Sequence, residues 1–250
     1  MNRKTAETNA LLALVMAVVL SALWPARAQD RKTSYPNMAP VDQYLMADRN
    51  AEIAMARSAA PEAISRDAKV LVLGRHGYET AVEGKNGFVC AVERSWMSPY
   101  ASSQFWNPKI RGPICFNPAA ARSVLPITYK RTELVLAGRS KAQMIAGVKD
   151  AIDKKEVPPL EPGAMTYMMS CESSIGNPLG HWVPHLMFYV PRTDGAAWGA
   201  DLRDSPVLLS RQFDGGPEAV TVFMIPVLNW SDGTPAASGC GSGNQKHGTT

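Results

Sequence analysis

The residues with the clearest potential for chemistry are Arg75 and His76, in the turn Gly74-Arg75-His76-Gly77. An imidazole can attack phosphorus as a nucleophile, and a neighbouring guanidinium can neutralise the phosphoryl oxygens. A second histidine would complete such a pocket. One hypothesis is therefore a phosphoryl hydrolase.

Arg75-His76-Gly77 is similar to the phosphate-binding turn of the histidine phosphatase superfamily. The resemblance implies that His76 is the nucleophile, that Arg75 is a phosphate ligand and that His181 or His185 is the second histidine of the pocket. In that superfamily the turn leads into a helix, whereas residues 78–93 here predict a strand, an Asn-Gly turn and a second strand. The match covers only about ten residues, so the alternative is a hairpin turn that happens to contain Arg and His.

A second candidate is the segment His181-Trp182-Val183-Pro184-His185. Pro184 excludes a helical His pair, but an extended chain could place both histidines on one face. Soft ligands lie near it in the sequence: Met168, Met169, Cys171 and Met187. Copper binding through His181 and His185 is therefore a second alternative. Methionines also fill cores, so we assign no metal ligand and expect no cofactor.

Aromatic residues gather in residues 95–117, which we expect to form a long ordered loop containing Trp106. These rings could line a ligand pocket, or they could cover the sheet as a second small core. The motifs of serine hydrolases, zinc proteases, P-loop proteins and dinucleotide-binding proteins do not occur in the sequence. Whether the protein is an enzyme stays open, and the sequence leans against it.

The first residues predict export. Residues 1–28 have a positive start, an apolar run from Ala10 to Leu23 and a small-residue cleavage site, so we expect a signal peptide cleaved after Ala28. Residues 29–40 predict an exposed leader, 41–230 a single domain and 231–250 a disordered tail. Cleavage removes three of the 26 basic residues and one of the 22 acidic ones, and no basic block remains to predict nucleic-acid binding.

Four cysteines lie beyond the signal peptide. In an oxidising compartment an even number favours disulfides, and we expect Cys90 to pair with Cys115. The sequence leaves open whether Cys171 pairs with Cys240.

Hydrophobic periodicity predicts the elements that must position these residues. Helices are expected over 42–59, over 118–137 with a break at Pro126, and after the capping residue Ser140. Strands are expected over 69–73, 78–82, 88–92, 164–169, 185–190 and 220–227, the first three as an antiparallel meander. The order α-βββ-αα-βββ predicts an α+β protein with a single mainly antiparallel sheet and helices packed on it.

The segments NGFVCAVER at 86–94 and PHLMFYVP at 184–191, together with the leading signal peptide, resemble a family of uncharacterised exported bacterial proteins. The resemblance implies export and a single domain, but no established activity and no catalytic residue.

We therefore expect a periplasmic or secreted protein that binds a small molecule or a protein partner. It would meet a membrane only during export. The predicted ligand-binding residues are Arg75, His76, Trp106, His181 and His185. The sequence does not fix the ligand, the oligomeric state, or the choice between periplasm and cell exterior.

Overall fold

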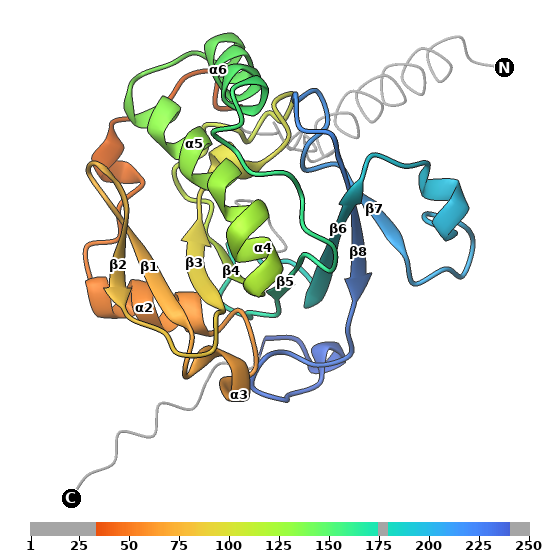
Figure 1. The fold of residues 1–250 in the computed structure, drawn as a ribbon. Helices are drawn as coiled ribbons and strands as arrows, with labels where there is room; N and C mark the ends of the chain where they lie inside the picture. The colour runs from red at the N-terminus through yellow and green to blue at the C-terminus, as the bar shows by residue number, and fades with distance from the viewer. Residues whose placement is uncertain (1–33, 175–179, 241–250) are drawn as a thin grey trace, which may run out of the picture. The chain divides into compact units, whose positions relative to one another are not determined.

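Eight strands form one sheet in the part of the chain that the computed structural model describes, residues 34–174 and 180–240. They are β1 (Lys69–Gly74), β2 (Gly77–Val82), β3 (Val89–Glu93), β4 (Gly112–Phe116), β5 (Met165–Met168), β6 (His185–Pro191), β7 (Leu208–Ser210) and β8 (Val220–Pro226). Their order across the sheet is β2-β1-β3-β4-β5-β6-β8-β7 (Figure 1). β1 and β3 run parallel, and the other described neighbours are antiparallel. The prediction of an α+β protein with a mainly antiparallel sheet is confirmed.

The expected antiparallel meander at the start of the sheet is only half correct. β1 and β2 form the predicted hairpin around residues 75–76, but β3 lies on the other side of β1 and runs parallel to it. The connection after β2 passes close to the start of β1, where a Cβ at Gly84 would lie 2.1 Å from the backbone nitrogen of Lys69. Because glycine permits this approach, the chain crosses β1 instead of turning back beside β2.

The prediction of a long loop over 95–117 is also wrong in part, because residues near its end form β4. This strand lies between β3 and β5 and is buried at every position. Cys90 and Cys115 are directly paired across β3 and β4 and form the predicted disulfide. β4 was not predicted from the sequence, because Gly112 and Pro113 are residue types that are rare inside central strands.

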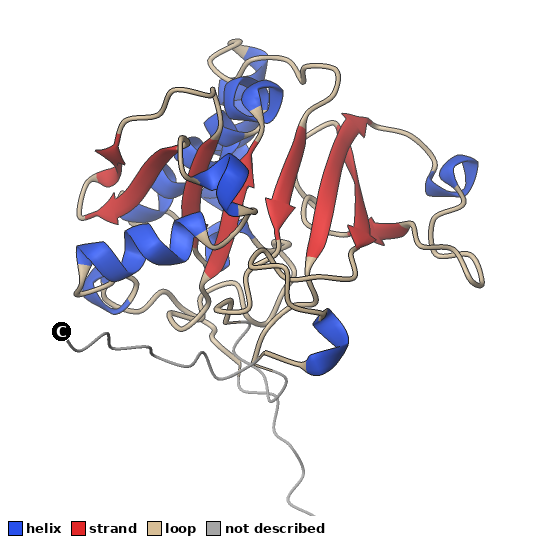
Figure 2. Cartoon of the chain, turned by 90° about the horizontal axis from the view of Figure 1, so that it is seen from below, coloured by secondary structure: helices blue, strands red, loops and turns tan. Residues whose placement is uncertain are grey.

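Helices cover both faces of the sheet (Figure 2). They are α2 (Arg49–Arg57), α3 (Glu62–Ser65), α4 (Pro118–Ser123), α5 (Leu125–Leu136) and α6 (Lys141–Asp153). Four 3-10 turns are also present in the described residues: η1 (Val41–Gln43), η2 (Ser95–Met97), η3 (Gly195–Trp198) and η4 (Ala236–Ser238). α2 packs on the face that carries the first disulfide, and α4 and α5 pack on the opposite face.

Capping residues set the helix boundaries. Ser140 and Gln143 form a capping box at the start of α6, as the sequence predicted for this helix. The helix expected over 42–59 is shorter, because the Asp48 carboxylate accepts hydrogen bonds from two backbone N–H groups and begins α2 at Arg49. The predicted break near Pro126 lies between α4 and α5.

The chain ends differ from expectation where the structure describes them. Tyr35 and Met38, in the expected leader, pack against the core. Residues 231–240, expected in a disordered tail, contain η4 and end in a disulfide between Cys240 and Cys171. This covalent bond holds a segment whose small polar residues bury little apolar surface. The predicted signal peptide and residues 241–250 lie outside the described residues.

Across residues 34–174 and 180–240, no helix has the length and apolar character that crossing a bilayer would require.

Candidate functional site

A cavity of about 240 Å³ lies at one end of the sheet, where β3 and β5 end and β4 and β6 begin; we call it the central cavity. Its apolar lining includes Met97, Ile110, Met168, Trp182, Met187 and Met224. Its polar lining includes Glu93, Arg94, His185 and Gln212. A mostly apolar pocket with a few polar groups is the usual form of a small-ligand site.

Strand register brings four of these side chains to one face. His185 is directly paired with Met168 on β5, and Met187 is directly paired with Met224 on β8. Directly paired residues share a face of a sheet, and so do residues two apart on one strand. The imidazole and three thioethers therefore lie on the same face, which is the face that lines the central cavity.

Trp182 forms a wall of the cavity because position 112 is glycine. A Cβ added to Gly112 would lie 3.1 Å from Cη2 and Cζ3 of Trp182 and 3.7 Å from Cβ of Glu93. The indole thus lies against the backbone at the start of β4, beside Glu93 at the end of β3. The backbone N–H of Trp182 donates to Ser173 Oγ at 3.1 Å, which fixes this segment.

The buried imidazole of His185 uses only one of its two ring nitrogens for a hydrogen bond within the described residues. The residue is 2% exposed, and its Nδ1 lies 2.7 Å from the carbonyl oxygen of Val183. A carbonyl only accepts, so Nδ1 carries the hydrogen and donates it. Burial lowers the pKa of His185, which keeps the ring neutral and leaves a lone pair on Nε2. Among the described residues, Nε2 has no hydrogen-bond partner.

Glu93 supplies a carboxyl group that titrates near neutral pH. Burial raises its pKa to about 7, while the hydroxyl of Thr128 and the charge of Arg131 partly oppose the rise. The Thr128 Oγ1 donates to Oε1 of Glu93 at 3.0 Å. A carboxyl of this kind and a neutral imidazole lining one cavity can each exchange a proton with a bound molecule.

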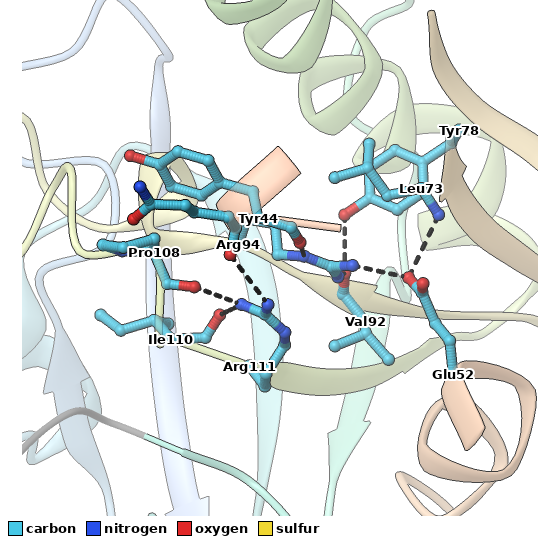
Figure 3. Close-up of polar contacts among 10 residues, drawn as sticks. Tyr44, Glu52, Leu73, Tyr78, Val92, Arg94, Pro108, Ile110 and Arg111 are labelled. Carbon is cyan, nitrogen blue, oxygen red and sulfur yellow. Dashed lines mark hydrogen bonds and ion pairs between the residues drawn. The ribbon is translucent and has the colours of Figure 1, made fainter. Parts of the chain in front are cut away.

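A buried arginine network supports the end of β3 (Figure 3). Arg94 donates to Oε1 of Glu52 at 2.8 Å and to the carbonyl oxygen of Tyr44 at 2.8 Å, and it also donates to the carbonyl oxygen of Val92. Both side chains of the Arg94–Glu52 ion pair are almost completely buried.

Arg111 lies beside this pair and donates to the carbonyl oxygens of Pro108 and Ile110. Burial and the charge of Arg94 lower its pKa to about 10. The network holds the backbone on either side of the cavity in place.

Of the five predicted ligand-binding residues, only His185 lines the central cavity. Arg75 and His76 are exposed in the hairpin turn, and Arg75 pairs with Asp42 at 2.7 Å. Trp106 is a core residue, 5% exposed, and its ring packs edge-on against Phe105. His181 is half-buried next to the cavity, with its ring against Trp230. The structure therefore does not bring the five together.

The phosphoryl hydrolase hypothesis needs His76 and a second histidine in one pocket. The turn that carries His76 lies at the end of β1, and His185 begins β6, four strands away. Neighbouring strands lie about 4.8 Å apart, so the turn that carries His76 and the start of β6 are separated by about 19 Å across the sheet. His76 and His185 therefore do not lie in one pocket, as this hypothesis would require if His185 were the second histidine.

Several cavity residues were missed by the sequence analysis, among them Glu93, Met97, Gln212 and Met224. Glu93 shares a strand face with Val89 and Ala91, and a carboxyl on this otherwise apolar face was the available signal. Within the described part of the chain, no three His, Cys, Asp or Glu side chains form a group that could hold a metal ion.

A second cavity, of about 410 Å³, lies between α6 and the start of β8. Its lining is mainly aliphatic and proline side chains. The charged group buried there, Glu218, accepts from both Nε and Nη2 of Arg131 through Oε1, while its Oε2 has no hydrogen-bond partner among the described residues. No histidine or methionine lines it, so the central cavity is the stronger candidate.

Comparison with known proteins adds no relative: no protein-family model matches the chain, and neither do the curated proteins or the solved structures. The resemblance to exported bacterial proteins stays a prediction.

Proposed function

We propose that this protein is a small-ligand-binding module whose ligand occupies the central cavity. The observation that carries the proposal is the Nε2 atom of His185, a buried atom without a hydrogen-bond partner among the described residues, on a side chain that lines a mostly apolar cavity. The amide oxygen of Gln212 is a second buried acceptor in the lining that lacks a described partner.

Buried hydrogen-bond acceptors without a partner reduce the stability of the folded protein. Leaving one buried polar atom unpaired costs about 1–3 kcal/mol, which a ligand recovers if it supplies a partner. The thioether and indole walls add apolar contact, and methionine side chains adapt to the shape of what they enclose. The fitting ligand is compact, complements the thioether and indole walls, and accepts the lone pair of an imidazole.

The two disulfides fit an oxidising compartment. We extend the proposal to export through residues 1–28, with cleavage after Ala28 and a mature protein in the periplasm or outside the cell. A soluble small molecule is the partner in this account, and neither nucleic acid nor a lipid surface is required.

A fragment library tested by ligand-observed NMR checks the proposal. Ser210 lines the cavity from the short edge strand β7, so Ser210→Trp places an indole where the ligand would bind. Ser103→Trp adds the same ring at an exposed position as the matched control. We expect fragments that bind the wild type and Ser103→Trp but not Ser210→Trp. Binding that survives Ser210→Trp, or its complete absence from the wild type, would overturn the assignment.

A further inference from the structure

The sulfur atoms around His185 indicate the chemical class of the ligand. Met97, Met168, Met187 and Met224 all line the central cavity, although an aliphatic lining would fill the same space. Thioether sulfur is a soft ligand that distinguishes monovalent copper from harder cations. Imidazole nitrogen binds copper as well, so the cavity combines two ligand types that suit the same ion.

The register places these ligands within reach of one another. His185 and Met168 are directly paired, and so are Met187 and Met224, with the two pairs two residues apart along β6. Directly paired residues have Cβ atoms about 4.5–5.5 Å apart. The Tyr189 hydroxyl donates to the Met187 sulfur at 3.5 Å, so this sulfur must turn away from Tyr189 to reach the imidazole. Methionine has three rotatable side-chain bonds, which permit such a turn.

The imidazole is already arranged as a metal ligand. A metal-binding histidine usually donates its second ring N–H to a carbonyl or carboxylate, which fixes the tautomer and directs the lone pair at the metal. Here Nδ1 donates to the carbonyl oxygen of Val183, and Nε2 is the free atom. In this tautomer the lone pair of the imidazole is on Nε2, where a cation can bind.

Other metals fit less well. Zinc, calcium and magnesium sites use combinations of Cys, His, Asp and Glu, and the described residues contain no group of three such side chains placed to hold a metal. All four cysteines are in disulfides, so no described thiolate competes for copper.

We infer that the central cavity binds one monovalent copper ion through Nε2 of His185 and the thioether sulfurs of Met168 and Met187, with Met224 next to them. This inference rests on the proposed function, because it names the ligand of the same cavity. The ion enters and leaves as Cu(I), so no electron transfer is involved.

Anaerobic competition tests the inference. Protein with both disulfides formed, checked by thiol titration, is mixed with the coloured complex of Cu(I) and bicinchoninate. We expect the wild type to withdraw one equivalent of copper. His185→Gln and Met168→Leu should weaken binding by about 10-fold or more. His181→Gln and Met169→Leu, which alter the neighbouring histidine and methionine outside the cavity lining, should bind as the wild type does.

Met→Leu substitutions keep core volume nearly constant, and thermal unfolding of each copper-free variant shows whether it is folded. The inference is overturned if the wild type withdraws no copper, or if all four variants lose copper equally. Fragment binding that Ser210→Trp abolishes would still support the proposed function in that case. If the wild type binds neither copper nor any fragment, the proposed function is refuted as well.

Discussion

Glu93 gives the most quantitative test of the cavity's structure. The perturbation is Glu93→Gln, which keeps the shape of the side chain and removes its titration. In the folded protein burial raises the pKa of Glu93 to about 7, against an ordinary value of 4.5. The folded state therefore retains a proton that the unfolded chain loses between these two pH values.

The sign and size of the effect follow from proton linkage. Between pH 4.5 and 7 the native state binds more protons than the unfolded state, so the free energy of unfolding falls as the pH rises. A difference of about two and a half pKa units corresponds to about 3 kcal/mol. We expect the wild type to lose about 3 kcal/mol more than Glu93→Gln between pH 4.5 and pH 8.

The assay is urea unfolding of both proteins across this pH range. The lowered pKa of His185 acts in the opposite direction, since a buried neutral imidazole loses stability as the pH falls. Both proteins contain His185, so its contribution cancels in the difference between them. Two parallel curves would refute the burial of the Glu93 carboxyl.

Thr128→Val provides an independent check on the same carboxyl. The Thr128 hydroxyl donates to Glu93 and opposes the rise in its pKa. Its removal should move the pKa of Glu93 further upward, so the pH-dependent loss of stability should extend to higher pH. A shift in the other direction would contradict the hydrogen bond.

Three further variants test the surroundings of the cavity. Replacing both Cys90 and Cys115 with Ala removes a disulfide that closes a 25-residue separation, and urea unfolding should show a loss of about 3 kcal/mol. Glu52→Gln leaves the Arg94 guanidinium buried without its ion pair and should cost about 3–5 kcal/mol in the same assay; a change below 1 kcal/mol would contradict its burial. Gly112→Ala places a methyl group 3.1 Å from the indole ring over it, so ligand binding should weaken while circular dichroism stays unchanged.

Strong local signals in the sequence correspond to correct parts of the fold. The turn at 75–76 formed a hairpin, Ser140 began a helix, and the apolar runs that begin at His185 and Val220 became central strands. These features depend on residues close together in the chain. The choice of neighbouring strands depends instead on contacts between distant parts of the chain. The connection after β2 packs against the start of β1 and accompanies the parallel pairing of β1 with β3, and hydrophobic periodicity does not predict such a contact.

The candidate site was harder to predict for the same reason. His185 was identified as a candidate second histidine of a phosphate pocket and as one half of the His181–His185 pair. Arg75 and His76 had the right chemistry, but a turn signal carries no information about what faces the turn. Trp106 is buried in the core, and an aromatic residue in a loop sequence does not reveal whether it covers the core or lines a pocket. Glu93 was visible only as a carboxyl on an apolar face.

The most direct test of the account is the protonation state of His185, measured by ¹⁵N NMR of the imidazole nitrogens at pH 7. The account predicts a neutral ring with the hydrogen on Nδ1, an unprotonated Nε2, and a large shift of the Nε2 resonance when Cu(I) is added. The resonances of His181 should stay in place. A hydrogen on Nε2, or an Nε2 resonance that neither Cu(I) nor any cavity-binding fragment moves, would contradict the claim that this atom receives the ligand.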